Sequence, residues 1–337
     1  MKFSCSQNTL VKALNIVSKA VTSRTTIPIL KGILIKVDEE GIVTMSASDL
    51  DISIEEKFEV VEFEPGEIVI QAKLFGDIIR KLPSDIVYIE ESEGNLNIKC
   101  AASDFKIIGN PSDEFPTINI GDTSEKISFD KEILKEMIRK TTFAASVDES
   151  RGVITGVLIE MKEDSLNMVA LDGFRMAVSR EKMINGREEN IIIPARILNE
   201  VAKIISEADS ESNEVDFFLS DKRAIFVIDN IKVVVRLLDG EYVRYNDILP
   251  KESQIRIVIN KTDLINSIER ASLFAKVGKN NLIKLNMSEN IMEITSKSEE
   301  GNVREEVMIT KEGKDLESAI IMTESEKYTG NICSLCN

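Results

Sequence analysis

One helical pattern occurs three times in this chain of 337 residues, and it constrains the fold more than any other feature. The copies are SQNTLVKALNIVSKAV from residue 6, DKEILKEMIRKTTFAA from residue 130 and NKTDLINSIERASLFA from residue 260. Each begins with a residue whose side-chain oxygen can cap a helix by accepting hydrogen bonds from free backbone N–H groups. Apolar residues follow at matching positions, first Leu10, Leu134 and Leu264, then Leu14, Ile138 and Ile268. This spacing predicts one apolar helix face per copy, and therefore a duplicated supersecondary unit.

The segments after the first two helices also match in order. Each contains alternating apolar residues typical of short strands, then a second amphipathic helix, then further strands. The second helices are predicted at 71–82 and 194–205. The predicted strands are 29–37, 41–47, 52–61, 67–70, 86–90, 95–101 and 105–108 in the first unit, and 156–161, 167–171, 175–180, 191–194, 214–219, 224–228 and 231–237 in the second. Each complete unit is therefore predicted to contain two β-α-β-β-β halves.

These patterns predict an α+β fold with three repeated domains at residues 1–123, 124–249 and 250–337. Short antiparallel strands with one buried face need a cover, and paired helices on one face supply it. The third unit starts correctly, with strands at 281–287, 291–296 and 303–309, and then departs from the pattern. Neither a second helix nor a further strand is predicted there, so we expect the third domain to be incomplete, that is, truncated or divergent at its end.

Composition argues against an enzyme. The chain has no histidine, which is the commonest general base and the commonest zinc ligand. No cofactor or metal site is predicted, because the four cysteines form no framework and Cys333-x-x-Cys336 lacks a second pair of ligands. No apolar run is long enough to span a bilayer, and the N-terminus lacks the apolar core of a signal peptide. We therefore expect a cytoplasmic protein with no membrane partner.

The net charge of −16 is unevenly distributed along the chain. The predicted helices at 7–21, 71–82 and 131–145 carry more bases than acids, and the two later helices are balanced. A neutral-to-basic helical surface in an acidic chain suits sequence-independent contact with phosphates. Lysine and arginine are also good residues for any exposed helix face, so the charge count alone does not decide between these interpretations. The helix bases assigned to a DNA-facing surface are Lys12, Arg80, Lys135, Arg139, Lys140 and Arg196.

Together with the repeat, several segments resemble the bacterial DNA polymerase III beta subunit, the replicative sliding clamp. The segments are RTTIPILKGILI (24–35), QAKLF (71–75), DEFP (113–116), RGVITGVLIE (151–160), DGFRMA (172–177), GEYVRYNDILP (240–250) and ERASLFA (269–275). The similarity extends to about residue 317. It implies two subunits closed head-to-tail into a homodimeric ring around double-stranded DNA, located with the nucleoid, with helices inside and Arg24 and Lys73 contacting DNA.

The same resemblance implies a pocket for short apolar peptides from DNA polymerase and clamp-loader subunits. The matching positions are Ile154, Gly156, Leu171, Gly173, Phe174, Arg175, Met176, Val243 and Ile248. Phe174 replaces the family's usual histidine and Val243 a common proline, so the pocket stays apolar. The family's ring interface corresponds to Phe105 and Ile107 on the first domain, against Leu273 and Phe274 on the third. Core packing is an alternative role for several of these apolar residues.

Two other interpretations stay open at this point. The incomplete third domain allows a clamp-derived regulatory protein that binds clamp partners without closing a ring. An enzyme that uses Asp49, Asp51 and Asp172 is less favoured, because aspartate at a turn serves local backbone geometry. A clamp performs no chemistry, and tethers a polymerase by raising its effective concentration at the primer end.

Overall fold

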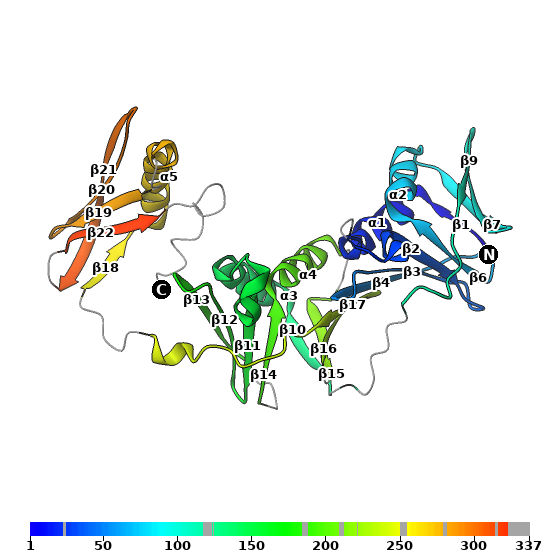
Figure 1. Cartoon of the computed structure of the whole chain (residues 1–337), viewed down its shortest axis with the longest axis horizontal. Coiled ribbons are helices and arrows are strands. Elements are labelled where there is room, and N and C mark those ends of the chain that lie inside the picture. The colour runs from blue at the N-terminus through cyan, green and yellow to red at the C-terminus, as the bar shows by residue number, and fades with distance from the viewer. Residues whose placement is uncertain are drawn as a thin grey trace. The chain divides into compact units, whose positions relative to one another are not determined.

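A computed structural model describes residues 1–22, 25–116, 123, 125–183, 188–208, 212–220, 222–249, 255–278, 282–313 and 316–322. The chain forms two compact units, Met1–Tyr242 and Val243–Asn337 (Figure 1). The N-terminal unit contains the first and second repeats, and the C-terminal unit contains the third.

The first repeat consists of two β-α-β-β-β halves, as predicted. Its elements are β1 (Lys2–Ser6), α1 (Gln7–Val17), β2 (Gly32–Val37), β3 (Ile42–Ser48), β4 (Ile52–Glu59), the short β5 (Phe63–Glu64), β6 (Gly66–Gln71), α2 (Ala72–Lys81), β7 (Ile86–Ser92), β8 (Asn95–Cys100) and β9 (Ser103–Ile108). The first predicted strand begins later than expected, because Pro28 starts a 3₁₀ turn (Pro28–Lys31).

The second repeat has the same order of elements. They are β10 (Ile127–Asp130), α3 (Lys131–Thr141), β11 (Gly156–Lys162), β12 (Ser165–Leu171), β13 (Met176–Lys182), β14 (Glu189–Pro194), α4 (Ala195–Glu207), β15 (Glu214–Ser220), β16 (Arg223–Ile228) and β17 (Ile231–Arg236). The capping prediction is confirmed: Ser6 accepts a hydrogen bond from the Thr9 N–H, and Asp130 from the Ile133 N–H.

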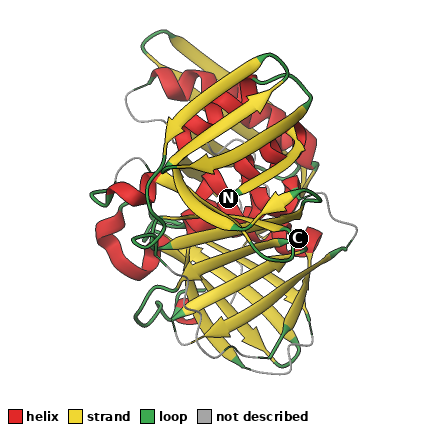
Figure 2. Cartoon of the chain, turned by 90° about the vertical axis from the view of Figure 1, so that its right-hand side faces the viewer, coloured by secondary structure: helices red, strands yellow, loops and turns green. Residues whose placement is uncertain are grey.

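The two halves of each repeat exchange their opening strands. In the first repeat β1 pairs with β7 of the other half, and β6 pairs with β2. In the second repeat β10 pairs with β15, and β14 with β11. Helices α1–α4 follow one another along one side of the N-terminal unit (Figure 1), and seen from the N-terminus strands lie in front of helices (Figure 2). One apolar core runs through both repeats.

A single pair of strands joins the two repeats. Strand β17 of the second repeat pairs antiparallel with β4 of the first, which produces one eight-stranded sheet, β10-β15-β16-β17-β4-β3-β2-β6. At this joint Val233 lies opposite Ile54 and Val235 opposite Ile52, and all four side chains are fully buried. Apolar burial across the joint therefore holds the two repeats as one compact unit.

The C-terminal unit repeats one half and begins a second. It contains β18 (Ile255–Ile259), α5 (Lys261–Val277), β19 (Leu282–Met287), β20 (Ile291–Ser298), β21 (Gly301–Gly313) and β22 (Leu316–Met322). Strand β22 pairs with β19, as β6 pairs with β2 and β14 with β11. Asn260 caps α5 by accepting hydrogen bonds from the N–H groups of Thr262 and Asp263.

The prediction that no strand follows residue 309 is therefore wrong. Strand β21 continues to Gly313 and β22 follows, because the chain completes the sheet with the opening strand of a second half. The predicted lack of a second helix concerns the segment after Met322, which lies outside the described residues.

One buried carboxylate lies at the joint between the repeats. Glu56 of β4 is opposite Ile231 of β17, and its Oε2 has no hydrogen-bond partner among the described residues. Burial raises the pKa of Glu56 from 4.5 to about 7, and the positive charge of Lys12 on α1 offsets part of this shift. Burial at the β17–β4 joint therefore favours the neutral, protonated form of the Glu56 carboxyl.

The stability of the N-terminal unit is expected to fall as pH rises. Because the pKa of Glu56 is higher in the folded chain than in the unfolded chain, its contribution is full below about pH 4.5 and is lost as pH rises through about 7. Glu56→Gln removes this titration. Its melting temperature should exceed the parent's by a few degrees at pH 8, and the gain should shrink at pH 5.

Glu55→Gln is the matched control, because Glu55 points to the other face of β4, opposite Lys232. The prediction fails if the two variants show the same pH dependence in thermal unfolding.

Candidate DNA-facing helices and peptide pocket

The exposed bases of α1 and α2 lie on neighbouring helices. Lys12 and Lys73 are exposed, and the Arg80 guanidinium donates hydrogen bonds to the Asn15 Oδ1 atom across the α1–α2 contact, at 3.2 and 3.3 Å. Gly76 allows this geometry, because a Cβ atom there would lie 2.8 Å from Arg80 Nη1. The ammonium of Lys73 has no ion pair in the part of the chain that the structure describes. These residues form a basic helix surface.

The three bases of α3 that were assigned to the DNA-facing surface are already paired on their own helix. Lys135 lies 2.7 Å from Glu132, and Glu136 lies 2.8 Å from Arg139 and 3.5 Å from Lys140. Hydrogen bonds from Arg139 hold the pKa of Glu136 below its ordinary value. Because exposed pairs neutralise charge while adding little stability, α3 contributes less positive potential than its count of bases suggests.

Arg196 has a different environment from the other predicted DNA contacts. Its guanidinium lies 3.3 Å from the Asp49 carboxylate, in the turn between β3 and β4, so it links the second repeat to the first. Lys19 makes a second link of this kind to Glu207 of α4, at 2.9 Å. Arg24 lies outside the described residues.

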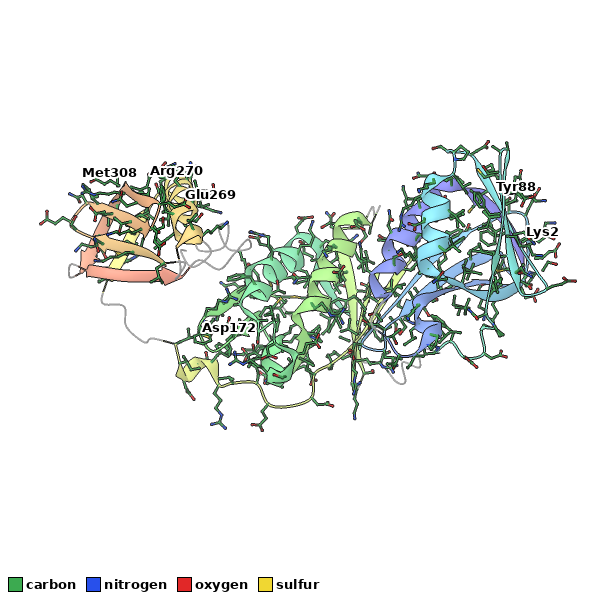
Figure 3. The ribbon with its side chains drawn as sticks, turned by 45° about the horizontal axis from the view of Figure 1, so that its top comes forward. Lys2, Tyr88, Asp172, Glu269, Arg270 and Met308 are labelled. Carbon is green, nitrogen blue, oxygen red and sulfur yellow. The ribbon has the colours of Figure 1, made fainter. Side chains whose placement is uncertain are left out.

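Seven of the predicted pocket residues gather at one edge of the second repeat, where β11 begins, β12 ends and β13 begins. The turn between β12 and β13 is organised by Asp172 (Figure 3), whose Oδ1 accepts hydrogen bonds from the N–H groups of Phe174 and Arg175 at 2.9 and 3.0 Å. Its Oδ2 binds Arg175 Nε at 2.9 Å. Gly173 supports the turn with a φ of 92°, and the Phe174 side chain is left 88% exposed.

The apolar residues of this edge lie at the ends of β12 and β13 and in the segment before β11. Leu171 and Met176 are opposite each other at the ends of β12 and β13, and Ile154 lies in the 3₁₀ segment Glu149–Thr155 that leads into β11. A Cβ atom at Gly156 would lie 2.6 Å from Ile192, so only glycine fits there. The Tyr242 hydroxyl donates a hydrogen bond to the Gly156 carbonyl at 3.3 Å.

Two residues of this edge, Arg151 and Tyr242, were not predicted from the sequence. Arg151 donates a hydrogen bond to the Asp172 carbonyl at 2.6 Å. The interpretation of Asp172 as a turn residue is confirmed. Burial raises the pKa of Tyr242 to about 12, while the Leu171 backbone hydrogen bond acts in the opposite direction. Both Arg151 and Tyr242 stand in the segments that carry the family resemblance, which is the signal that could have identified them.

The remaining predicted residues lie at strand edges or in the C-terminal unit. Phe105 is 37% exposed on β9, an edge strand, whereas Ile107 is buried in the core. In the C-terminal unit Val243, Ile248 and Leu273 are exposed, and the Phe274 ring covers Gly301 at the start of β21. Figure 3 shows Glu269 and Arg270 on α5 of that unit, and Arg270 pairs with Glu305 of β21 at 2.6 Å.

The described residues contain neither a metal site nor a membrane-spanning helix. No cluster of three or more histidine, cysteine, aspartate or glutamate side chains could hold a metal ion there. No described helix is long and apolar enough to cross a membrane.

Family models match the chain in three consecutive stretches. Residues 1–119 match the N-terminal domain of the DNA polymerase III beta subunit, residues 128–244 its central domain and residues 246–323 its C-terminal domain. The third match continues through β22, and so extends beyond the limit of about residue 317 that the sequence analysis set.

Named relatives and solved structures agree with these matches. The beta sliding clamp of Bacillus subtilis is 36% identical over 94% of this chain and 86% of its own length. The crystal structure of the DNA polymerase sliding clamp from Bacillus subtilis has a TM-score of 0.89 at 34% identity, covering 96% of this chain and 87% of its own. A putative DNA polymerase III beta subunit from Eubacterium rectale has a TM-score of 0.88 at 34% identity, covering 95% and 87%. The chain belongs to the DNA polymerase III beta subunit family of sliding clamps.

Proposed function

We propose that this chain is the subunit of a homodimeric ring that encircles double-stranded DNA and tethers the replicative polymerase. The observation that carries the proposal is the series of three consecutive family matches, at residues 1–119, 128–244 and 246–323. The ring does no chemistry and needs no cofactor. It acts in the cytoplasm, on the nucleoid. The domain boundaries we propose are those of the repeats, near residues 123 and 249.

The helices of the N-terminal unit supply the DNA-facing surface. Lys12, Lys73 and Arg80 are exposed on α1 and α2, and would meet phosphates without reading bases. Arg24, which the family resemblance assigns to DNA contact, would add to them. The bases of α3, which are paired with Glu132 and Glu136, and Arg196, which is paired with Asp49, would contribute less.

Ring closure is supported by the way in which two repeats of the same chain pair with each other, which serves as an internal template for pairing between copies. Strand β17 ends the second half of its repeat and pairs with β4, which ends the first half of the neighbouring repeat. The strands in the corresponding places are β9 and β21. On β9 the edge away from β8 has no partner strand, and the same holds for residues 301–308 of β21 away from β20, within the described residues. We propose that β9 of one copy pairs with β21 of a second copy.

The internal template also predicts the register of that pairing. Arg223 and Arg236 pair in the β16–β17 hairpin as Asn95 and Ile108 do in β8–β9, so Phe105 corresponds to Val233. Likewise Met308 of β21 corresponds to Glu59 of β4, and Val303 to Ile54. The observed contact of Val233 with Ile54 then predicts Phe105 against Val303, close to Phe274 and Leu273.

The second-repeat edge provides the proposed peptide pocket. Ile154, Leu171 and Met176 offer an apolar floor, and the turn residues Phe174 and Arg175 form a rim. Short apolar peptides of polymerase and clamp-loader subunits would dock there with Leu or Phe anchors. We propose that Gly156, Gly173, Val243 and Ile248 also belong to this site.

Ring closure on DNA is the direct test of the proposed function. The protein, loaded on a nicked circular duplex, should be retained during gel filtration and released when the circle is linearised. A mass near one subunit at micromolar concentration, without retention on the circle, would instead favour a regulatory protein that binds clamp partners.

The register predicts an opposite-charge pair between copies. The observed Lys232–Glu55 pairing at the internal joint corresponds to Asp104 of one copy opposite Arg304 of the other. Asp104→Arg should therefore weaken dimerisation about tenfold, since like charges would face each other across the strands. The double variant Asp104→Arg/Arg304→Asp should restore the parent affinity in sedimentation equilibrium.

Lys106→Gln is the control for this charge swap, because the register places Lys106 opposite the neutral Asn302. A double variant no better than Asp104→Arg alone would refute the register and leave the DNA-retention test of the ring unaffected.

The salt dependence of DNA affinity should distinguish Lys73 from Arg139, which pairs with Glu136. Lys73→Gln should lower the slope of log affinity against log salt concentration by about one, as expected for one lost phosphate contact. Arg139→Gln should change the slope less, because its guanidinium already pairs with Glu136. The measurement is fluorescence anisotropy with a short linear duplex between about 50 and 200 mM salt. Equal slopes for the parent and Lys73→Gln would exclude Lys73 from the DNA-facing surface.

A further inference from the structure

The turn that organises the second-repeat edge also occurs in the first repeat. Asp49 Oδ1 accepts hydrogen bonds from the N–H groups of Asp51 and Ile52 at 3.0 and 2.8 Å. Asp172 makes the same two bonds to the residues two and three positions further on. The strands that flank the two turns also pair in the same way, Ser48 with Ser53 and Leu171 with Met176. The edge proposed to bind peptides therefore has a counterpart between the first and second repeats.

One residue of the first-repeat turn is in an unfavourable conformation. Leu50 has a φ of 78°, at the position where Gly173 has a φ of 92°. The left-handed region costs a leucine roughly 1–2 kcal/mol, and glycine adopts it without this cost. The Leu50 side chain is also 52% exposed, so core packing does not offset the strain. Local folding alone would favour glycine, which suggests that the exposed leucine has another role.

A small pocket lies next to Leu50. It has a volume of about 50 Å³, and its walls include Leu50, Pro116, Val234, Arg223 and Arg236. On β17 the residues Ile231, Val233 and Val235 face the helix-covered core, so Val234 and Arg236 face the other side of the sheet. This volume holds a few water molecules or one small anionic group, such as a carboxylate. The pocket is therefore separate from the DNA-facing helices.

The charge of the pocket favours an anionic ligand. Arg223 and Arg236 are directly opposite on β16 and β17, where like charges destabilise each other. The Arg236 guanidinium has no hydrogen bond or ion pair in the described structure, although the Asp51 carboxylate lines the same pocket. The hydroxyls of Ser48 and Ser53 lie 2.7 Å apart and add polar groups to the wall. A ligand carboxylate would pair with the Arg236 guanidinium.

We propose that the pocket beside Leu50, between the first and second repeats, is a second peptide-binding site. Its ligand would be a peptide with an acidic residue flanked by aliphatic residues. The ligand's carboxylate would bind Arg236, and an aliphatic side chain would pack against Leu50 and Pro116. This assignment rests on the proposed function, because it treats the junction as the counterpart of the peptide pocket. Nucleic acid is a poorer fit, since a pocket of about 50 Å³ admits one small anion and not a run of phosphates.

The test uses the full chain carrying Phe174→Asp, which blocks the other pocket, and fluorescence anisotropy of a labelled Ala-Leu-Glu-Leu-Ala amide. Arg236→Gln should weaken binding of this peptide at least tenfold. Leu50→Gly should weaken binding at least threefold while raising the melting temperature, because it removes both the contact and the backbone strain. Arg180→Gln, an exposed arginine on β13, should change binding less than twofold. Replacing the peptide's glutamate by glutamine should abolish the effect of Arg236→Gln.

Unchanged binding in both Arg236→Gln and Leu50→Gly would overturn the proposal, and so would displacement of the peptide by a single-stranded oligonucleotide at lower concentration than by unlabelled peptide. Both variants are also tested for retention on nicked circular DNA, without the Phe174→Asp change. Retention in both would show that the clamp function stands even if the second peptide site fails. If the parent chain is not retained on nicked circular DNA, that result would instead contradict the proposed function itself.

Discussion

Pairing of β17 with β4 is the interaction on which the N-terminal unit depends. It makes one sheet from strands of two repeats and buries Ile52, Ile54, Val233 and Val235 between them. Because side chains alternate along a strand, the same pairing sends one set of residues under the helices and the other to the opposite face. The helix surface and the Leu50 pocket therefore lie on opposite faces of a single sheet. A change at the joint would displace both.

Local periodicity explains why much of this fold could be predicted from the sequence. The helices and the hairpins of the first two repeats depend on patterns within a dozen residues, and these were placed correctly. The opening strands β1, β10 and β18 were missed because each is a short strand whose partner is distant in sequence, and strand β22 was missed as well. Lys2 pairs with Glu90, and Ile127 with Phe217. No local pattern in LESAIIM distinguishes a strand of a second half from a loop.

The sequence predicts where the residues of the candidate sites lie better than it predicts their ion-pair and hydrogen-bond partners. Three of the four bases on α3 were assigned to the DNA-facing surface, but their electrostatic effect depends on Glu132 and Glu136, which pair with them. Arg196 is exposed on its helix, as predicted, yet its partner Asp49 lies 147 residues earlier in the chain. Tyr242 donates one hydrogen bond to the Gly156 carbonyl, at the edge of the second repeat that we propose as the peptide pocket. Such pairs become visible only when the topology brings distant segments together.

Duplication offers a way to separate structural residues from functional ones within one chain. The turns at Asp49 and Asp172 have the same hydrogen bonds and the same positive φ at the next residue, so their backbone requirements are equal. A residue that adopts the positive φ of these turns without strain needs no explanation beyond the backbone geometry. Gly173 meets that requirement, whereas Leu50 meets it only with strain and without burial. The backbone that the two turns share does not explain the difference between the copies, which is why we assign the Leu50 side chain a ligand outside the turn.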